Sequence, residues 1–135
     1  AMAQNENLRV ALDLTAEWDA TQEEGGSRLV TGVTIARTDF LEENEDAVKD
    51  FLAEHEESAA FTNENPEQAA QWIAELEIVA KAPIAQKAIP ACNITCIDGN
   101  EMKDALGGYL SALYELEPTS IGGALPADDF YYGAK

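Results

Sequence analysis

The chain has 135 residues, of which 26 are Asp or Glu, 8 are Lys or Arg and one is His, so its formal net charge is −18. That length suits one domain with a hydrophobic core. The charge excludes nucleic acid and anionic membrane surfaces as expected partners, because both are bound through basic patches. No apolar run approaches the ~20 residues that span a bilayer. We therefore expect a soluble acidic domain.

The cysteine and histidine content argues against a catalytic or metal site. Cys92 and Cys96 belong to a β-branched stretch, and four residues along a strand span ~13 Å, too far for a disulfide. A zinc site would need two further ligands, and His55 is the one histidine of the sequence. A Cys–His nucleophile pair can be drawn from these residues, but no motif supports it. We expect two small buried or half-buried thiols, no metal, no cofactor and no enzymatic activity.

Three segments have the pattern of β-strands. Residues 8–15 alternate apolar and polar side chains, as in a half-buried strand. Residues 29–37 place apolar side chains on both faces, as in a strand covered on each side, and Gly32 suggests a bulge or a close backbone approach. Residues 93–97 are the third predicted strand.

Two helices are predicted between the second and third strands from clear start signals. Asn44 is a favourable N-cap for residues 44–61, in which apolar side chains and His55 share one stripe. Asn65 and Pro66 begin the next helix as its cap and its first helical residue.

A short helix is expected over residues 83–90, and a longer one from Asp98 to about residue 116. The pair Gly107 and Gly108 inside the longer helix costs about 2 kcal/mol relative to alanine, which suggests close packing against a neighbour. The resulting order β-β-α-α-α-β-α predicts an α/β fold. Its three strands are few for a sheet covered on both faces, so the predicted three-layer lobe looks incomplete.

Several segments resemble one protein family. Residues 29–44, which read LVTGVTIARTDFLEEN, and the following 46–52 are similar to the carboxy-terminal part of the solute-binding proteins of ABC importers. The nitrate, sulfonate and taurine branch, with its pyrimidine-precursor-binding relatives, looks nearest. Residues 63–70 and the stretch from 97 to 132 fit the same family. The resemblance covers residues 4–132 and carries no catalytic motif.

The resemblance implies a type II periplasmic-binding-protein fold, in which two α/β lobes close on a solute. Family members have two complete lobes, whereas these residues correspond to part of one. We therefore expect residues 1–135 to be a single α/β domain and a fragment, the carboxy-terminal contribution to one lobe. Such a fragment would form a homodimer or an element-swapped assembly to cover its exposed sheet.

The resemblance also implies a function. The parent protein would be extracytoplasmic, periplasmic or a cell-surface lipoprotein, and would deliver a small solute to an ABC permease. Near the solute cleft we expect Thr15, Glu17, Trp18, Thr31 and Gly32. Trp18 would stack on a planar solute, although a packing role also fits it, and a strand bulge explains Thr31 and Gly32 equally well.

A second function fits the composition without the resemblance. The protein would be a self-contained acidic domain that works by protein interaction or oligomerisation, and the uncovered edge of the predicted sheet favours this. The acidic clusters between residues 42 and 57 are expected on the outer face of the long helix. Such a face would aid solubility and, under the importer hypothesis, would steer the protein toward a basic surface of the permease.

Overall fold

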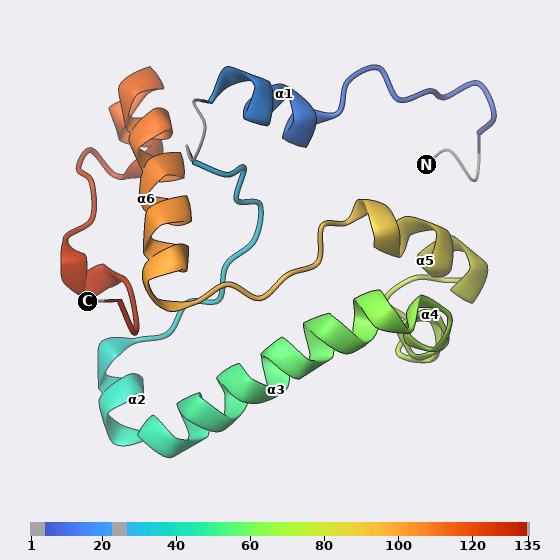
Figure 1. Ribbon diagram of the computed structural model, residues 1–135, viewed down its shortest axis with the longest axis horizontal. Coiled ribbons are helices and arrows are strands. Elements are labelled where there is room, and N and C mark those ends of the chain that lie inside the picture. The colour runs from blue at the N-terminus through green and yellow to red at the C-terminus, as the bar shows by residue number, and fades with distance from the viewer. Residues whose placement is uncertain (1–4, 23–26, 135) are drawn as a thin grey trace. The chain divides into compact units, whose positions relative to one another are not determined.

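The computed structural model of the chain describes residues 5–22 and 27–134, which are 63% helical and contain no strand (Figure 1). The predicted α/β lobe of a type II periplasmic-binding-protein fold is therefore wrong, and the fold is all-α. The α-helices are α1 (Leu14–Thr21), α2 (Thr38–Glu43), α3 (Glu45–Glu64), α4 (Pro66–Glu75), α5 (Ala82–Ala88) and α6 (Gly99–Leu116). Short 3₁₀ turns cover Ile89–Ala91, Pro118–Ile121 and Asp128–Phe130.

The strand predicted over residues 8–15 is replaced by irregular chain and the start of α1. The carboxylate of Asp13 accepts hydrogen bonds from the backbone N–H groups of Thr15 and Ala16, at 3.0 and 3.2 Å, and so begins a helix. Val10 is 66% exposed, so its apolar side chain is not covered as a strand face would be. Alternating apolar and polar residues stabilise a strand only when a neighbouring strand supplies hydrogen bonds and a core covers the apolar side chains. Here a local cap prevails over that pattern.

The strands predicted over residues 29–37 and 93–97 are also wrong, because both stretches lack regular structure. Ile35, expected to be covered, is 82% exposed. The bulge or close approach expected at Gly32 is absent as well, since a Cβ added there would meet no atom within 4 Å. Apolar residues on both faces of a short segment do not by themselves provide the layers that would cover them.

The four predicted helices are confirmed as α3 to α6. Asn44 and Asn65 are the N-cap residues of α3 and α4, but neither side chain accepts a capping hydrogen bond. Instead their amides donate backward, from Asn44 to the carbonyl of Phe40 at 2.9 Å and from Asn65 to that of Phe61 at 3.3 Å. The Asn44 amide therefore supplies a partner to a carbonyl near the end of α2, where intrahelical donors run out. The Phe61 carbonyl at the end of α3 also accepts the backbone N–H of Asn65, at 2.8 Å.

The described residues divide into two compact units, one formed by residues 35–96 and the other by those up to 34 and from 97 onward. In the first unit α4 and α5 lie side by side (Figure 1). Their shared core is small, because alanines supply most of it and allow the helices to approach closely: Ala69, Ala70, Ala85 and Ile89. Phe61 of α3 stacks on Trp72 of α4 at a ring-centroid distance of 5.0 Å. This contact attaches the long helix to the α4–α5 pair.

The second unit is organised by α6. The indole N–H of Trp18 donates to the carbonyl of Ser27 at 3.1 Å, and its ring packs on Tyr109 of α6 at 5.2 Å. A Cβ added to Gly108 would lie 2.5 Å from the Ser27 Cβ and 3.2 Å from its Cα. The close packing predicted at the glycine pair is therefore confirmed for Gly108.

Two adjacent alanine substitutions test this packing. Gly108→Ala should lower the free energy of unfolding by about 1–3 kcal/mol, because the new methyl group overlaps Ser27. Gly107→Ala places its Cβ 3.5 Å from the Tyr131 hydroxyl, an ordinary contact, and should raise stability by up to about 1 kcal/mol through helix propensity. Urea unfolding followed by circular dichroism measures both. Equal effects of the two changes would show that Ser27 does not lie against Gly108.

Tyr131 gives this unit a dependence on alkaline pH. Burial raises the pKa of Tyr131 above its ordinary value, while Lys103 lowers it and Asp128 raises it. The folded chain thus favours the neutral phenol. The contribution of Tyr131 to the free energy of unfolding is complete below about pH 10, where a tyrosine of the unfolded chain ionises, and it is lost as the pH rises above that value. When the pH is raised across that value, the free energy of unfolding should decrease less for Tyr131→Phe than for the unaltered chain. Tyr132→Phe, at an exposed position, should keep the full decrease.

Candidate functional site

The structure places the five predicted solute-binding residues outside any sheet. Thr15, Glu17 and Trp18 lie on α1, whereas Thr31 and Gly32 lie exposed in irregular chain. Thr15 and Trp18 are half-buried, and Glu17 is an exposed residue of the first helical turn. The strand ends that were expected to bring these residues to a cleft are absent from the described residues. Their role as solute ligands stays a prediction.

Trp18 has a clear structural use. Its indole N–H donates a hydrogen bond to the Ser27 carbonyl, and its ring packs against Tyr109. A half-buried tryptophan with its polar atom satisfied is typical of a packing residue. The contacts therefore support the packing interpretation of Trp18.

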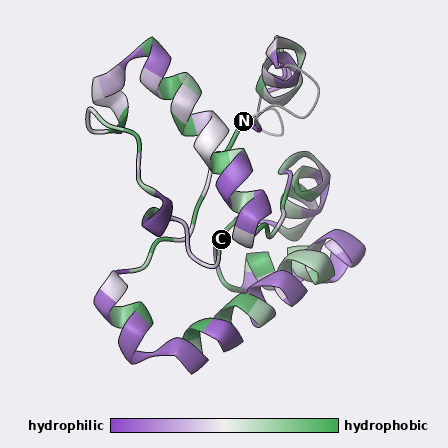
Figure 2. Cartoon of the chain, turned by 60° about the vertical axis from the view of Figure 1, so that its left-hand side comes forward, coloured by the Kyte–Doolittle hydropathy of each residue, from purple (hydrophilic) through white to green (hydrophobic). Residues whose placement is uncertain are grey.

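Negative charge is concentrated on α2 and α3. Residues 38–64 contain ten acidic side chains and one lysine, so they account for half of the net charge of −18. The Lys49 ammonium nitrogen lies 3.5 Å from a carboxylate oxygen of Glu45 and 3.7 Å from one of Asp46, both within the same helix. All ten acidic residues are exposed, which confirms the expected solvated face. In Figure 2 much of the ribbon of α3 has the purple colour of hydrophilic residues. We call this set the acidic surface: Asp39, Glu42, Glu43, Glu45, Asp46, Asp50, Glu54, Glu56, Glu57 and Glu64.

Aromatic side chains lie among these carboxylates. Phe40 on α2 and Phe51 on α3 are each 47% exposed. The Phe51 ring stacks on the imidazole of His55, with centroids 5.6 Å apart and an interplanar angle of 12°. The α2–α3 segment therefore combines dense negative charge with apolar area that could be buried against another molecule.

A thiol and an imidazole meet on another part of α3. Nδ1 of His55 lies 3.3 Å from Sγ of Cys96, although 41 residues separate the two in the sequence. His55 occupies the helix position that was predicted, and Cys96 lies in irregular chain rather than in a strand. Cys96 is half-buried, whereas Cys92 is exposed at the end of the Ile89–Ala91 turn. No local motif signals this pairing, because it depends on where the 94–96 segment lies.

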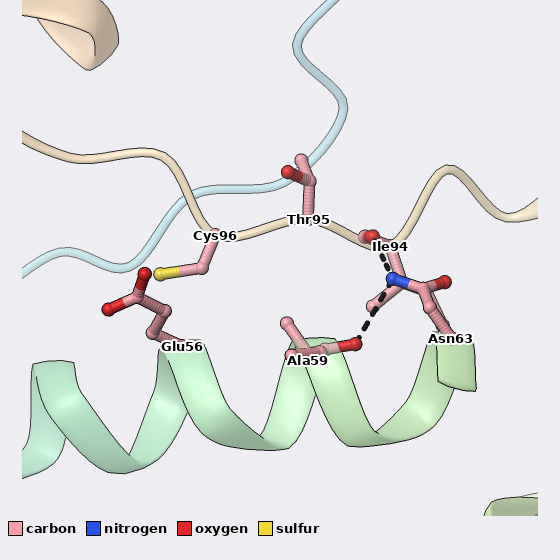
Figure 3. Close-up of a pocket in the computed structure, with 7 residues that line it drawn as sticks. Glu56, Ala59, Asn63, Ile94, Thr95 and Cys96 are labelled. Carbon is pink, nitrogen blue, oxygen red and sulfur yellow. Dashed lines mark hydrogen bonds between the residues drawn. The ribbon is translucent and has the colours of Figure 1, made fainter. Parts of the chain in front are cut away.

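The 94–96 segment lies along α3 and forms a pocket with it (Figure 3). The Asn63 amide donates to the carbonyls of Ala59 at 3.1 Å and Ile94 at 2.9 Å. These bonds hold one end of the segment, and the His55–Cys96 contact lies toward its other end. The pocket has a volume of about 190 Å³. It is lined by Glu56, Ala59, Ala60, Asn63, Ile94, Thr95 and Cys96.

Within the described parts of the chain, no group of three or more His, Cys, Asp or Glu side chains is placed to hold a metal ion. Nor does any described helix have the length and apolar character needed to cross a membrane. No protein-family model, curated protein or solved structure matches the chain. The resemblance to solute-binding proteins of ABC importers therefore stays a prediction.

Proposed function

We propose that this protein is an interaction domain whose acidic surface binds a basic partner that also presents apolar side chains. The carrying observation is that residues 38–64 bear half of the net charge of −18, interspersed with the exposed rings of Phe40 and Phe51. Complementary charge accelerates association and selects against wrong partners. Buried aromatic rings contribute much of the affinity of typical protein interfaces.

Charge indicates what kind of partner fits. A second copy of the chain would bring an equal negative charge to the interface, and nucleic acid or an anionic membrane would be repelled in the same way. The 20 residues of α3 extend over about 30 Å, several times the ~8 Å screening length at physiological salt. An extended basic segment, such as an amphipathic helix with lysine or arginine on its flanks, can therefore contact carboxylates along the whole helix.

Binding of a basic amphipathic peptide tests this function. A fluorescently labelled peptide of lysine and leucine with helical spacing should bind, and its affinity should fall steeply with salt. Four charge-neutralising changes on the acidic surface should weaken binding by about tenfold, because each exposed charge pair contributes about 0.2–1 kcal/mol. The changes are Glu42→Gln, Glu43→Gln, Glu54→Gln and Glu57→Gln.

A control removes the same number of charges from exposed positions elsewhere. It consists of Glu6→Gln, Glu67→Gln, Glu75→Gln and Glu115→Gln. This control should change the affinity less than twofold, because it leaves the acidic surface intact. Equal losses in both variants would indicate attraction by net charge alone and would contradict an assigned surface.

The oligomeric state distinguishes this proposal from the self-association that the sequence suggested. Repulsion between two copies of the acidic surface should keep the chain monomeric at low ionic strength, where screening is weak. Light scattering coupled to size exclusion, over a range of concentrations and salt, measures this. A dimer that persists at low salt would favour self-association over a basic partner.

Solute binding by an extracytoplasmic component of an ABC importer remains the proposal that the sequence resemblance supports. It requires a cleft between two lobes. The helical structure of the described residues supplies no sheet on which the expected binding residues would converge. The interaction function is preferred because it rests on exposed charge and aromatic area that the described helices present directly.

A further inference from the structure

We propose that Cys96 is a reactive thiol, activated by His55, that forms a mixed disulfide with small cationic disulfides. The inference is independent of the proposed interaction function, because it rests on the pocket between α3 and the 94–96 segment. Three features support it: a base in contact with the sulfur, a framework that holds the two together, and an open pocket beside them.

The framework follows from helical spacing. His55, Ala59 and Asn63 lie four residues apart on α3, so they share one face of the helix. The 94–96 segment runs along this face, with the Ile94 carbonyl bonded to Asn63 at 2.9 Å and the Cys96 sulfur 3.3 Å from His55. The Phe51 ring stacks against the imidazole, with centroids 5.6 Å apart. The sulfur and the base are therefore positioned by separate contacts.

The chemistry needs one proton acceptor and one disulfide. With its own proton on Nε2, the His55 imidazole can accept the thiol proton at Nδ1 as the Cys96 sulfur attacks. One S–S bond forms between Cys96 and the nearer sulfur of the reagent, and the S–S bond of the reagent breaks. The departing thiolate takes the proton from the imidazolium. Cys96 is thereby oxidised to a disulfide, and half of the reagent is reduced to a thiol.

The surroundings select the charge of the reagent. Glu56 lines the same pocket as Cys96, and Figure 3 shows its carboxylate at the Cys96 end of the pocket. Further carboxylates of the acidic surface, including Glu54 and Glu57, lie on the same helix. A carboxylate opposes an anionic thiolate and repels an anionic reagent, whereas it attracts a cationic one. The volume of about 190 Å³ suits a small aliphatic disulfide.

Two single-thiol variants provide the test within one chain. Cys92→Ser leaves Cys96, and Cys96→Ser leaves the more exposed Cys92. With cystamine near neutral pH, followed by intact mass, Cys96 should react about tenfold faster than Cys92. If solvent exposure of the sulfur alone set the rate, the more exposed Cys92 would react faster than Cys96. Equal rates, or a faster Cys92, would overturn the proposal.

The role of His55 is tested in the variant that retains Cys96. His55→Gln should lower the cystamine rate about tenfold, and added imidazole should restore part of the rate of His55→Gly. In the variant that retains Cys92, His55→Gln should leave the rate unchanged, which controls for unfolding. If neither His55 substitution changed the rate of Cys96, His55 would not be the base that activates this thiol.

The charge of the pocket gives a readout that loss of structure would not reproduce. Glu56→Gln should slow the reaction of Cys96 with cystamine relative to dithiodiglycolate, an anionic disulfide of similar size. The ratio of the two rates should fall by about threefold or more, as expected for one partly screened charge. An unchanged ratio would show that Glu56 does not select the reagent and would contradict the cationic class.

Discussion

The side-chain amide of Asn63 joins two parts of the 35–96 unit that nothing in the local sequence brings together. It donates to the Ala59 carbonyl within α3 and to the Ile94 carbonyl of the segment that follows α5. The Ile94 bond helps to hold this segment beside the helix, together with the packing of the Ile94 side chain against the alanine-rich core. The pocket and the contact between His55 and Cys96 both depend on this path.

The unit has little apolar area with which to stabilise this arrangement. Its core consists mainly of alanines, which allow close helix contact but bury few atoms each. The acidic residues in the first turn of α3, Glu45 and Asp46, interact favourably with the helix dipole. Most of the other carboxylates of the acidic surface repel one another. Such a surface is maintained at a cost in stability, which is consistent with a role in binding rather than in folding.

Local signals in the sequence predict α3 to α6 correctly, whereas the three predicted strands are wrong and α1 and α2 are not predicted. α3 and α4 begin directly after Asn44 and Asn65 as predicted, with Pro66 as the first residue of α4, although the two asparagine side chains bond to the preceding helices instead of capping the following ones. The alternation over residues 8–15 has no such local cause, because a strand needs hydrogen bonds from a distant segment. The Asp13 carboxylate was the overlooked signal there, as it caps α1 over a distance of three residues.

The sequence by itself determined the charge of the chain, the positions of α3 to α6 and the exposure of the acidic surface. These properties depend on composition and on neighbours within one or two helical turns. Only the tertiary structure decided that Trp18 packs against Tyr109 and that Cys96 meets His55. Both contacts join residues far apart in the chain. The Cys96 contact depends on the path of the irregular 94–96 segment, which the Asn63 bond and the packing of Ile94 on the core help to set rather than any local pattern of residues.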